Sequence, residues 1–172
     1  MRHITFLIYY LIVLGIFACK SAKKTTQSSK SNISVNKDTE LQSNQKVNKV
    51  ISTARSYIGT PYKFGGTSRA GIDCSGLVKS TFAEAGTSMP RTSHEQSLIG
   101  KKISLSELKP GDLVFFVNKK GETQITHVGI ISVVNGPRNV KFIHSSTKLG
   151  VVESDLYVSY YENILIKATR VL

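Results

Sequence analysis

Four regimes of hydrophobic and polar residues follow one another along this chain of 172 residues. Residues 4–18 are uncharged and mostly apolar, whereas residues 20–46 contain almost no apolar side chain. From Val47 onward, apolar residues recur at helical spacing, and beyond residue 100 the spacing shortens to two. Because a period of 3.6 indicates helix and a period of two indicates strand, the folded part is expected to carry its helices before its strands.

Two amphipathic helices are expected at the start of the folded part. The first covers residues 47–58 and ends at Gly59. The second runs over residues 74–85 and stops at Gly86, with Asp73 in the position of an N-cap. A glycine-rich loop, TPYKFGGTSRAG, joins the two helices.

A run of strands follows, separated by turn sequences such as NKKGE, NGPRN and TKLG. The expected strands cover residues 112–117, 124–134, 139–146, 150–155 and 164–171. Helices followed by strands predict an α+β fold, with the N-terminal helices packed on an antiparallel sheet of about five to six strands.

The N-terminal residues resemble a bacterial lipoprotein signal. Arg2 precedes the apolar run at 4–18, which has the length of a signal-peptide core, and the run ends in GIFAC. We predict a signal peptide over residues 1–18 and lipidation of Cys19, which would hold the chain at a membrane; the alternative is an uncleaved N-terminal anchor helix. Polar residues 20–46 cannot bury enough surface to form a core, so residues 19–46 are expected to be a lipidated cysteine and a disordered tether, followed by one domain at 47–172.

Charge and motifs narrow the possible partners. The chain carries 23 Lys and Arg against 11 Asp and Glu, a formal net charge of +12, which favours an anionic surface or polymer. No dense run of arginine with interleaved aromatic residues is present, so a nucleic-acid partner is not predicted. Neither HExxH nor CxxC occurs, and no metal or other cofactor is predicted.

Cys74 is the only thiol left if Cys19 carries lipid. Its expected place in the first turn of a helix provides unpaired N–H groups and the positive end of the helix dipole, which predict a lowered thiol pKa. Small Ser75 and Gly76 should leave the sulfur accessible and their N–H groups free for an oxyanion. The alternative is that Cys74 is a buried small hydrophobe.

Two of the three histidines in the mature chain lie on neighbouring expected strands. His127 opens the strand at 124–134, and His144 lies late in the strand at 139–146. Adjacent antiparallel strands can bring both side chains together, giving a cysteine nucleophile, a base and a residue that orients the base. Each histidine could instead be an ordinary surface or core residue, and His94 is interpreted as solvated surface.

From Val47 to the C-terminus the chain resembles the NlpC-type cell-wall cysteine endopeptidases, a bacterial branch of the papain-like fold. Within that family it looks most like outer-membrane lipoproteins that trim murein crosslinks. The motifs that carry the resemblance are GTPYKFGG (59–66), GIDCSGLV (71–78), MPRTSHEQ (89–96), KPGDLVFF (109–116), THVGI (126–130) and FIHSS (142–146).

The resemblance implies roles for individual residues. It makes Cys74 the nucleophile, His127 the general base and His144 the residue that orients His127. The hydroxyl of Tyr62 would lie near the cysteine and help to stabilise the oxyanion, although Tyr62 could be only a packing aromatic.

Three further positions match substrate-binding residues of the family. Asp73 and Ser75 would bind the free amine and the peptide groups of the substrate, and Arg91 would lie beside the cleft. Asp73 could equally be only an N-cap, and Arg91 only a member of an ion pair.

The implied function is hydrolysis of peptide bonds in the stem peptides of peptidoglycan, at the D,D-crosslink or at the γ-D-glutamyl bond. The implied partners are peptidoglycan and, through the lipid, a membrane, with a monomeric exported lipoprotein facing the periplasm from the outer membrane. Two alternatives stay open: a non-catalytic lipoprotein that binds the wall, and a Cys/His amidase or acyltransferase acting on another bacterial amide.

Overall fold

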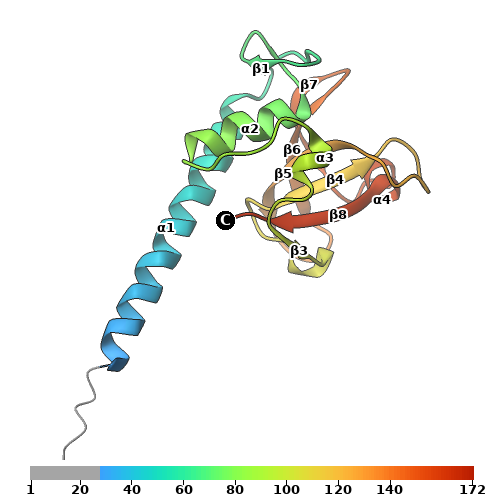
Figure 1. Ribbon diagram of the computed structural model, residues 1–172. Helices are drawn as coiled ribbons and strands as arrows, with labels where there is room; N and C mark the ends of the chain where they lie inside the picture. The colour runs from blue at the N-terminus through green and yellow to red at the C-terminus, as the bar shows by residue number, and fades with distance from the viewer. Residues whose placement is uncertain (1–27) are drawn as a thin grey trace, which may run out of the picture.

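Two helices pack side by side against a six-stranded antiparallel sheet in the computed structural model, which describes residues 28–172 (Figure 1). The expected α+β class is therefore confirmed. The helices are α1 (Ser28–Ser56), α2 (Cys74–Glu84), α3 (Ser93–Gln96) and α4 (Ser159–Ile164), with a 3-10 turn η1 (Leu105–Glu107). The strands are β1 (Thr67–Ser68), β2 (Gly71–Ile72), β3 (Lys101–Ile103), β4 (Leu113–Val117), β5 (Ile125–Val134), β6 (Val140–Ser146), β7 (Gly150–Asp155) and β8 (Leu165–Arg170).

The sheet has the strand order β3-β8-β4-β5-β6-β7, so the C-terminal strand β8 lies between β3 and β4. The strands β4 to β7 form a meander, in which each strand pairs with the next along the chain. A separate pair, β1 and β2, lies in the loop that leads into α2.

Both faces of the sheet are buried around β4. Leu113 and Phe115 belong to a core shared with α1 and α2, whereas Val114 and Phe116 belong to a second core closed partly by Ile164 of α4. Burial on both faces explains why this strand is a continuous apolar run in the sequence. Successive side chains of β5 alternate in the same way between the two faces of the sheet, and the candidate site includes neighbouring residues of this strand.

The structure corrects the expected tether, because residues 28–46 form the N-terminal part of α1. Val50 and Ala54 are fully buried near the C-terminal end of the helix, whereas none of the side chains at 37–46 is buried. A helix nucleated by packing extends at one hydrogen bond per added residue, and the Lys, Glu and Gln residues within 37–46 favour helix. The polar composition of this segment thus indicated correctly that its side chains at 37–46 are not buried, but it did not exclude a helical backbone.

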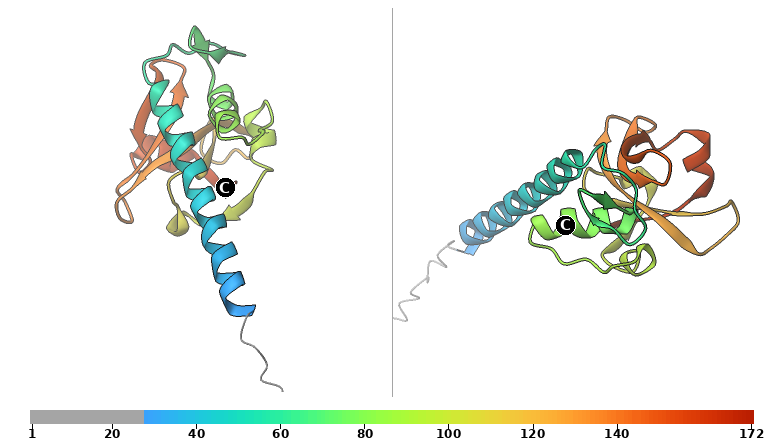
Figure 2. Two further views of the ribbon diagram at one scale, coloured as in Figure 1. Left: turned by 90° about the vertical axis from the view of Figure 1, so that its left-hand side faces the viewer. Right: turned by 90° about the horizontal axis from the view of Figure 1, so that it is seen from above.

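The exposed part of α1 projects away from the rest of the molecule in two further views (Figure 2). Among residues 28–172, no helix combines the length and the apolar character needed to cross a membrane. The predicted signal peptide and Cys19 lie outside the described residues.

Candidate active site

Cys74 is the first residue of α2, directly after the N-cap residue Asp73. Asp73 has an extended backbone, and its carboxylate accepts a hydrogen bond of 2.7 Å from the N–H of Gly76. A side chain at Gly76 would meet the carbonyl oxygen of Gly66 at 2.2 Å. The glycines of the preceding loop and of the first helical turn therefore allow the close packing that fixes the start of α2.

Cys74 is half-buried, and nearby backbone N–H groups, among them that of Val128 on β5, lower its thiol pKa. Burial nevertheless raises the pKa of the Cys74 thiol, and the nearby Asp73 carboxylate raises it further, against the smaller effect of the N–H donors. The expectation of a lowered thiol pKa is therefore wrong for this site, because desolvation outweighs the helix terminus. The Gly76 N–H is also occupied by Asp73, so it is not free for an oxyanion.

His127 and His144 meet directly. Nε2 of His127 lies 2.9 Å from Nδ1 of His144, and the two rings are perpendicular with their centroids 5.0 Å apart. His127 is partly buried at the start of β5, and His144 is 1% exposed on β6. The neighbouring strands thus bring the two histidines together, with Nδ1 of His127 left for another partner.

Burial keeps both imidazoles neutral. It lowers the pKa of His127 from 6.5 to about 4. It also lowers the pKa of His144 to about 3, with repulsion from His127 as a second cause. At neutral pH the site therefore holds a thiol and two neutral imidazoles.

Aromatic and hydroxyl side chains surround His144. The ring of Phe142 stacks on it at 4.6 Å and 18°. Its Nε2 lies 3.1 Å from Oγ of Ser154 on β7 and 3.1 Å from the hydroxyl of Tyr161 on α4. A side chain at Gly129 would meet Phe142 at 2.4 Å, so the glycine after Val128 gives this stacked ring its space.

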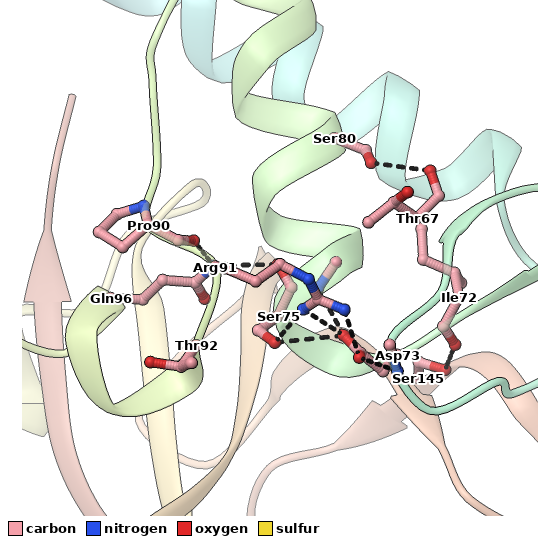
Figure 3. A network of polar contacts seen from close by, with 12 residues as sticks. Thr67, Ile72, Asp73, Ser75, Ser80, Pro90, Arg91, Thr92, Gln96 and Ser145 are labelled. Carbon is pink, nitrogen blue, oxygen red and sulfur yellow. Dashed lines mark hydrogen bonds and ion pairs between the residues drawn. The ribbon is translucent and has the colours of Figure 1, made fainter.

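Asp73, Ser75 and Arg91 form one polar cluster at the start of α2 (Figure 3). Arg91 donates to both carboxylate oxygens of Asp73, at 2.9 and 2.6 Å, and to the Ser75 hydroxyl at 2.8 Å. Gly65 donates a further N–H to Asp73 at 2.8 Å. The hydrogen bonds from Arg91, Gly76 and Gly65, with the charge of Arg91, lower the pKa of Asp73 although burial opposes them.

The cluster, Tyr62 and Cys74 line a cavity of about 350 Å³. Burial raises the pKa of the Tyr62 hydroxyl, and Cys74 and Asp73 add to this effect. A second cavity, of about 440 Å³, is lined by His127 and His144. Thr126 lines both cavities, so the cysteine and the histidines face adjoining spaces.

Other features of the described residues lie apart from this region. His94 is exposed on α3. A further cavity, of about 620 Å³, lies between α1 and the 109–112 turn and includes neither Cys74 nor His127 among its lining residues. Over residues 28–172, no three His, Cys, Asp or Glu side chains are grouped as a metal site would need.

Four residues at the site were not singled out from the sequence. Thr126 and Phe64 line the cavities, and Ser154 and Tyr161 contact His144. Thr126 directly precedes His127, which is the one local signal that could have drawn attention to it. Ser154 and Tyr161 reach the site only through the pairing of β6 with β7 and the return of α4, which no local pattern reveals.

The chain belongs to the NlpC/P60 family, whose model matches residues 59–170. It is similar to the probable endopeptidase NlpC of Escherichia coli K12, with 41% identity over 118 residues, 68% of this chain and 73% of that protein. It is also similar to the murein DD-endopeptidase MepS/murein LD-carboxypeptidase of the same organism, with 42% identity over 115 residues, 66% of this chain and 57% of that protein.

Solved structures show the same relationship. An NlpC/P60 family protein from Bacillus cereus superposes with a TM-score of 0.67 and 31% identity, over 73% of this chain and 40% of that one. A lipoprotein-like NLP/P60 protein from Staphylococcus aureus gives a TM-score of 0.63 and 35% identity, over 74% of this chain and 42% of that one. The chain thus spans under half the length of either structure.

Proposed function

We propose that this chain is a cysteine endopeptidase that hydrolyses peptide bonds in the stem peptides of peptidoglycan. The observation that carries the proposal is the meeting of three elements. Cys74 begins α2 close enough to the N–H of Val128 on β5 for this group to lower its thiol pKa, and the residue before Val128, His127, is hydrogen-bonded to His144 on β6. The names of the relatives NlpC and MepS, a probable endopeptidase and a murein DD-endopeptidase, favour the same chemistry.

In the proposed reaction, Nδ1 of His127 accepts the thiol proton of Cys74 as the sulfur attacks an amide carbonyl. The Cys74 N–H and the Tyr62 hydroxyl stabilise the oxyanion, a contribution of about 3 kcal/mol for a typical donor. His127 then gives its proton to the leaving amine and activates the water that hydrolyses the thioester. His144 holds the ring of His127 throughout.

The polar cluster shapes the wall beside Cys74. Asp73 and Ser75 are buried and engaged by Arg91, so a substrate amine would have to displace part of this network to reach the Asp73 carboxylate. Arg91 keeps 35% of its side chain exposed. This geometry favours substrate contact by Arg91 and a supporting role for Asp73 and Ser75.

Digestion of murein tests the proposed function. The full chain and its Cys74→Ser variant are incubated with purified murein and with defined muropeptides, and the products are identified by mass. We expect new peptide ends from the wild type and none from the variant, and the product masses distinguish the D,D-crosslink from the γ-D-glutamyl bond. Intact murein after incubation with wild type, or equal release by both proteins, would contradict the proposal and favour wall binding or another amide substrate.

We also propose that Cys19 carries a lipid that places the monomeric enzyme in the cell envelope. The motif GIFAC supports this anchor, and more than one acyl chain gives stable membrane attachment. Labelled palmitate should enter the wild type, and Cys19→Ser should remain unlabelled and leave the membrane fraction. If the wild type never acquires the label, the lipid-anchor proposal is wrong, whereas the peptidase proposal is tested separately by the murein digest.

A further inference from the structure

The hydrogen-bond chain from His127 does not end at His144. Nε2 of His144 lies 3.1 Å from the Ser154 hydroxyl and 3.1 Å from the Tyr161 hydroxyl. The two hydroxyls therefore approach the same ring nitrogen, one from β7 and one from α4. The reaction proposed above uses neither hydroxyl, although both are held against a ring that is 1% exposed.

The position of one proton on His144 decides what His127 can do. To accept the thiol proton at Nδ1, His127 must carry its own proton on Nε2, and that N–H must be donated to Nδ1 of His144. Neutral His144 has a single ring proton, which must then lie on Nε2 and needs an acceptor. Burial keeps His144 neutral, since it lowers the pKa of this ring to about 3.

The opposite arrangement would disable the base. If His144 carried its proton on Nδ1, it would donate to Nε2 of His127, and the proton of neutral His127 would sit on Nδ1. The nitrogen left for the thiol would then have no lone pair to accept a proton. The two tautomers of one buried ring therefore correspond to a competent and an incompetent site.

We propose that Ser154 and Tyr161 are positioning residues, whose oxygens accept the Nε2 proton of His144 and so hold the competent tautomer. The tautomer is inferred from the contacts around His144, and only its catalytic consequence rests on the proposed peptidase function. Each hydroxyl oxygen has lone pairs that can accept the Nε2 proton of His144, while its own proton points to another acceptor. Because either oxygen can accept, we expect each to compensate for loss of the other.

Variants that keep the aromatic packing around His144 distinguish a positioning role from a purely structural one. The Tyr161 ring contacts Phe142 edge-on at 4.9 Å and His144 at 5.3 Å. Tyr161→Phe keeps these contacts and removes only the hydroxyl. Ser154→Ala similarly removes one oxygen from a half-exposed position on β7. The double variant therefore deletes both acceptors and leaves the ring packing in place.

Nitrogen NMR of the full chain, labelled at histidine, reads the tautomer without any substrate. In the wild type we expect Nε2 of His144 to give a protonated, pyrrole-type signal and Nδ1 a pyridine-type signal. In the double variant Ser154→Ala/Tyr161→Phe the two signals should mix or exchange. A wild type protonated at Nδ1, or a double variant indistinguishable from wild type, would overturn the proposal.

Kinetics with muropeptides gives the second readout. We expect each single variant to lose less than threefold in kcat, and the double variant to lose at least tenfold with KM unchanged. Ser154→Thr, which retains a hydroxyl, should rescue the double variant when it replaces Ser154→Ala. Tyr157→Phe is the matched control, because Tyr157 lies in the same segment with its ring against Arg138.

The two readouts separate the failure of this proposal from failure of the proposed function. A double variant that is no slower than Tyr157→Phe, in an active enzyme, would refute the positioning role. An NMR shift of the tautomer in a protein that never cleaves murein would uphold the positioning role and refute the peptidase.

Discussion

Burial governs the protonation of the residues proposed to carry the reaction. It raises the pKa of the Cys74 thiol and lowers the pKa of His127 to about 4. The free site therefore rests as a neutral thiol beside a neutral imidazole, so the thiolate forms as substrate is attacked.

Substitution of the histidines should separate the base from its orienting residue. His127→Ala should lower muropeptide release by about 10²–10⁴-fold, the usual contribution of a general base. His144→Asn and His144→Gln should stay well above His144→Ala, because an amide can still hydrogen-bond His127. His94→Ala, at an exposed position, is the control. Loss of activity in His94→Ala with an unaffected His144→Ala would show that the wrong histidine has been assigned.

The buried imidazoles also predict how stability depends on pH. Their folded pKa values, about 4 for His127 and about 3 for His144, lie below the ordinary 6.5. Between pH 6.5 and the folded pKa values, the histidines bind more protons in the unfolded chain than in the folded one. The stability that the two neutral imidazoles contribute is therefore fully present above about pH 6.5 and is lost as the pH falls toward 4 and below. Urea unfolding should show this decline, at no more than about 1.4 kcal/mol per pH unit for each ring. His144→Gln should make the slope shallower, and an identical slope in that variant would count against a buried neutral His144.

At the scale of secondary-structure elements, α2 owes the position of its first residue to Asp73. This side chain caps the helix through Gly76 and binds Arg91 from the 89–96 segment. The cap and the ion pair are separate contributions, because an asparagine can still accept the N–H of Gly76 but cannot pair with the guanidinium in the same way.

Asp73→Ala should therefore destabilise the domain more than Asp73→Asn does. Loss of the cap alone costs about 1 kcal/mol, and the alanine also leaves the Arg91 guanidinium without its carboxylate. Urea unfolding gives both values. Glu84→Gln, which breaks an exposed ion pair between α2 and Lys49 of α1, should cost less than about 0.5 kcal/mol. Equal effects of Asp73→Ala and Glu84→Gln would exclude a structural role for the cap and pair.

The elements that the sequence predicted are those with a strong periodic signal. The strands β4 to β8 match their expected ranges within two residues, and α2 ends at Glu84, two residues before the expected stop at Gly86, which has a φ of 72°. The short elements α3, β3 and α4 were missed, because none exceeds six residues and a pattern needs more than one turn or pleat to be recognised. Contacts between elements, such as those of Ser154 and Tyr161 with His144, depend on strand register and chain topology, so no local sequence pattern reveals them.

For the whole molecule, the exposed part of α1 should contribute little to stability. No side chain at 37–46 is buried, and Leu41 is 56% exposed. Deletion of residues 20–46 should therefore leave the melting temperature within about 3 °C of wild type, which corresponds to roughly 1 kcal/mol for a chain of this size. Circular dichroism should show less helix at the same time. A larger drop in melting temperature would mean that this half of α1 packs on the domain.

A helix in place of a coil over residues 28–46 changes the distances at which the domain can lie from an N-terminal anchor. At 1.5 Å per residue, the 19 residues from 28 to 46 form a strut of about 28 Å. A coil of that length has a similar average span, about 24 Å, but it also folds back on itself and visits short separations. With Cys19 anchored in a membrane, this rigid helix would keep the cavity beside Cys74 away from the lipid surface. The cavity would then spend less time at the lipid surface and more time at the distance where murein lies.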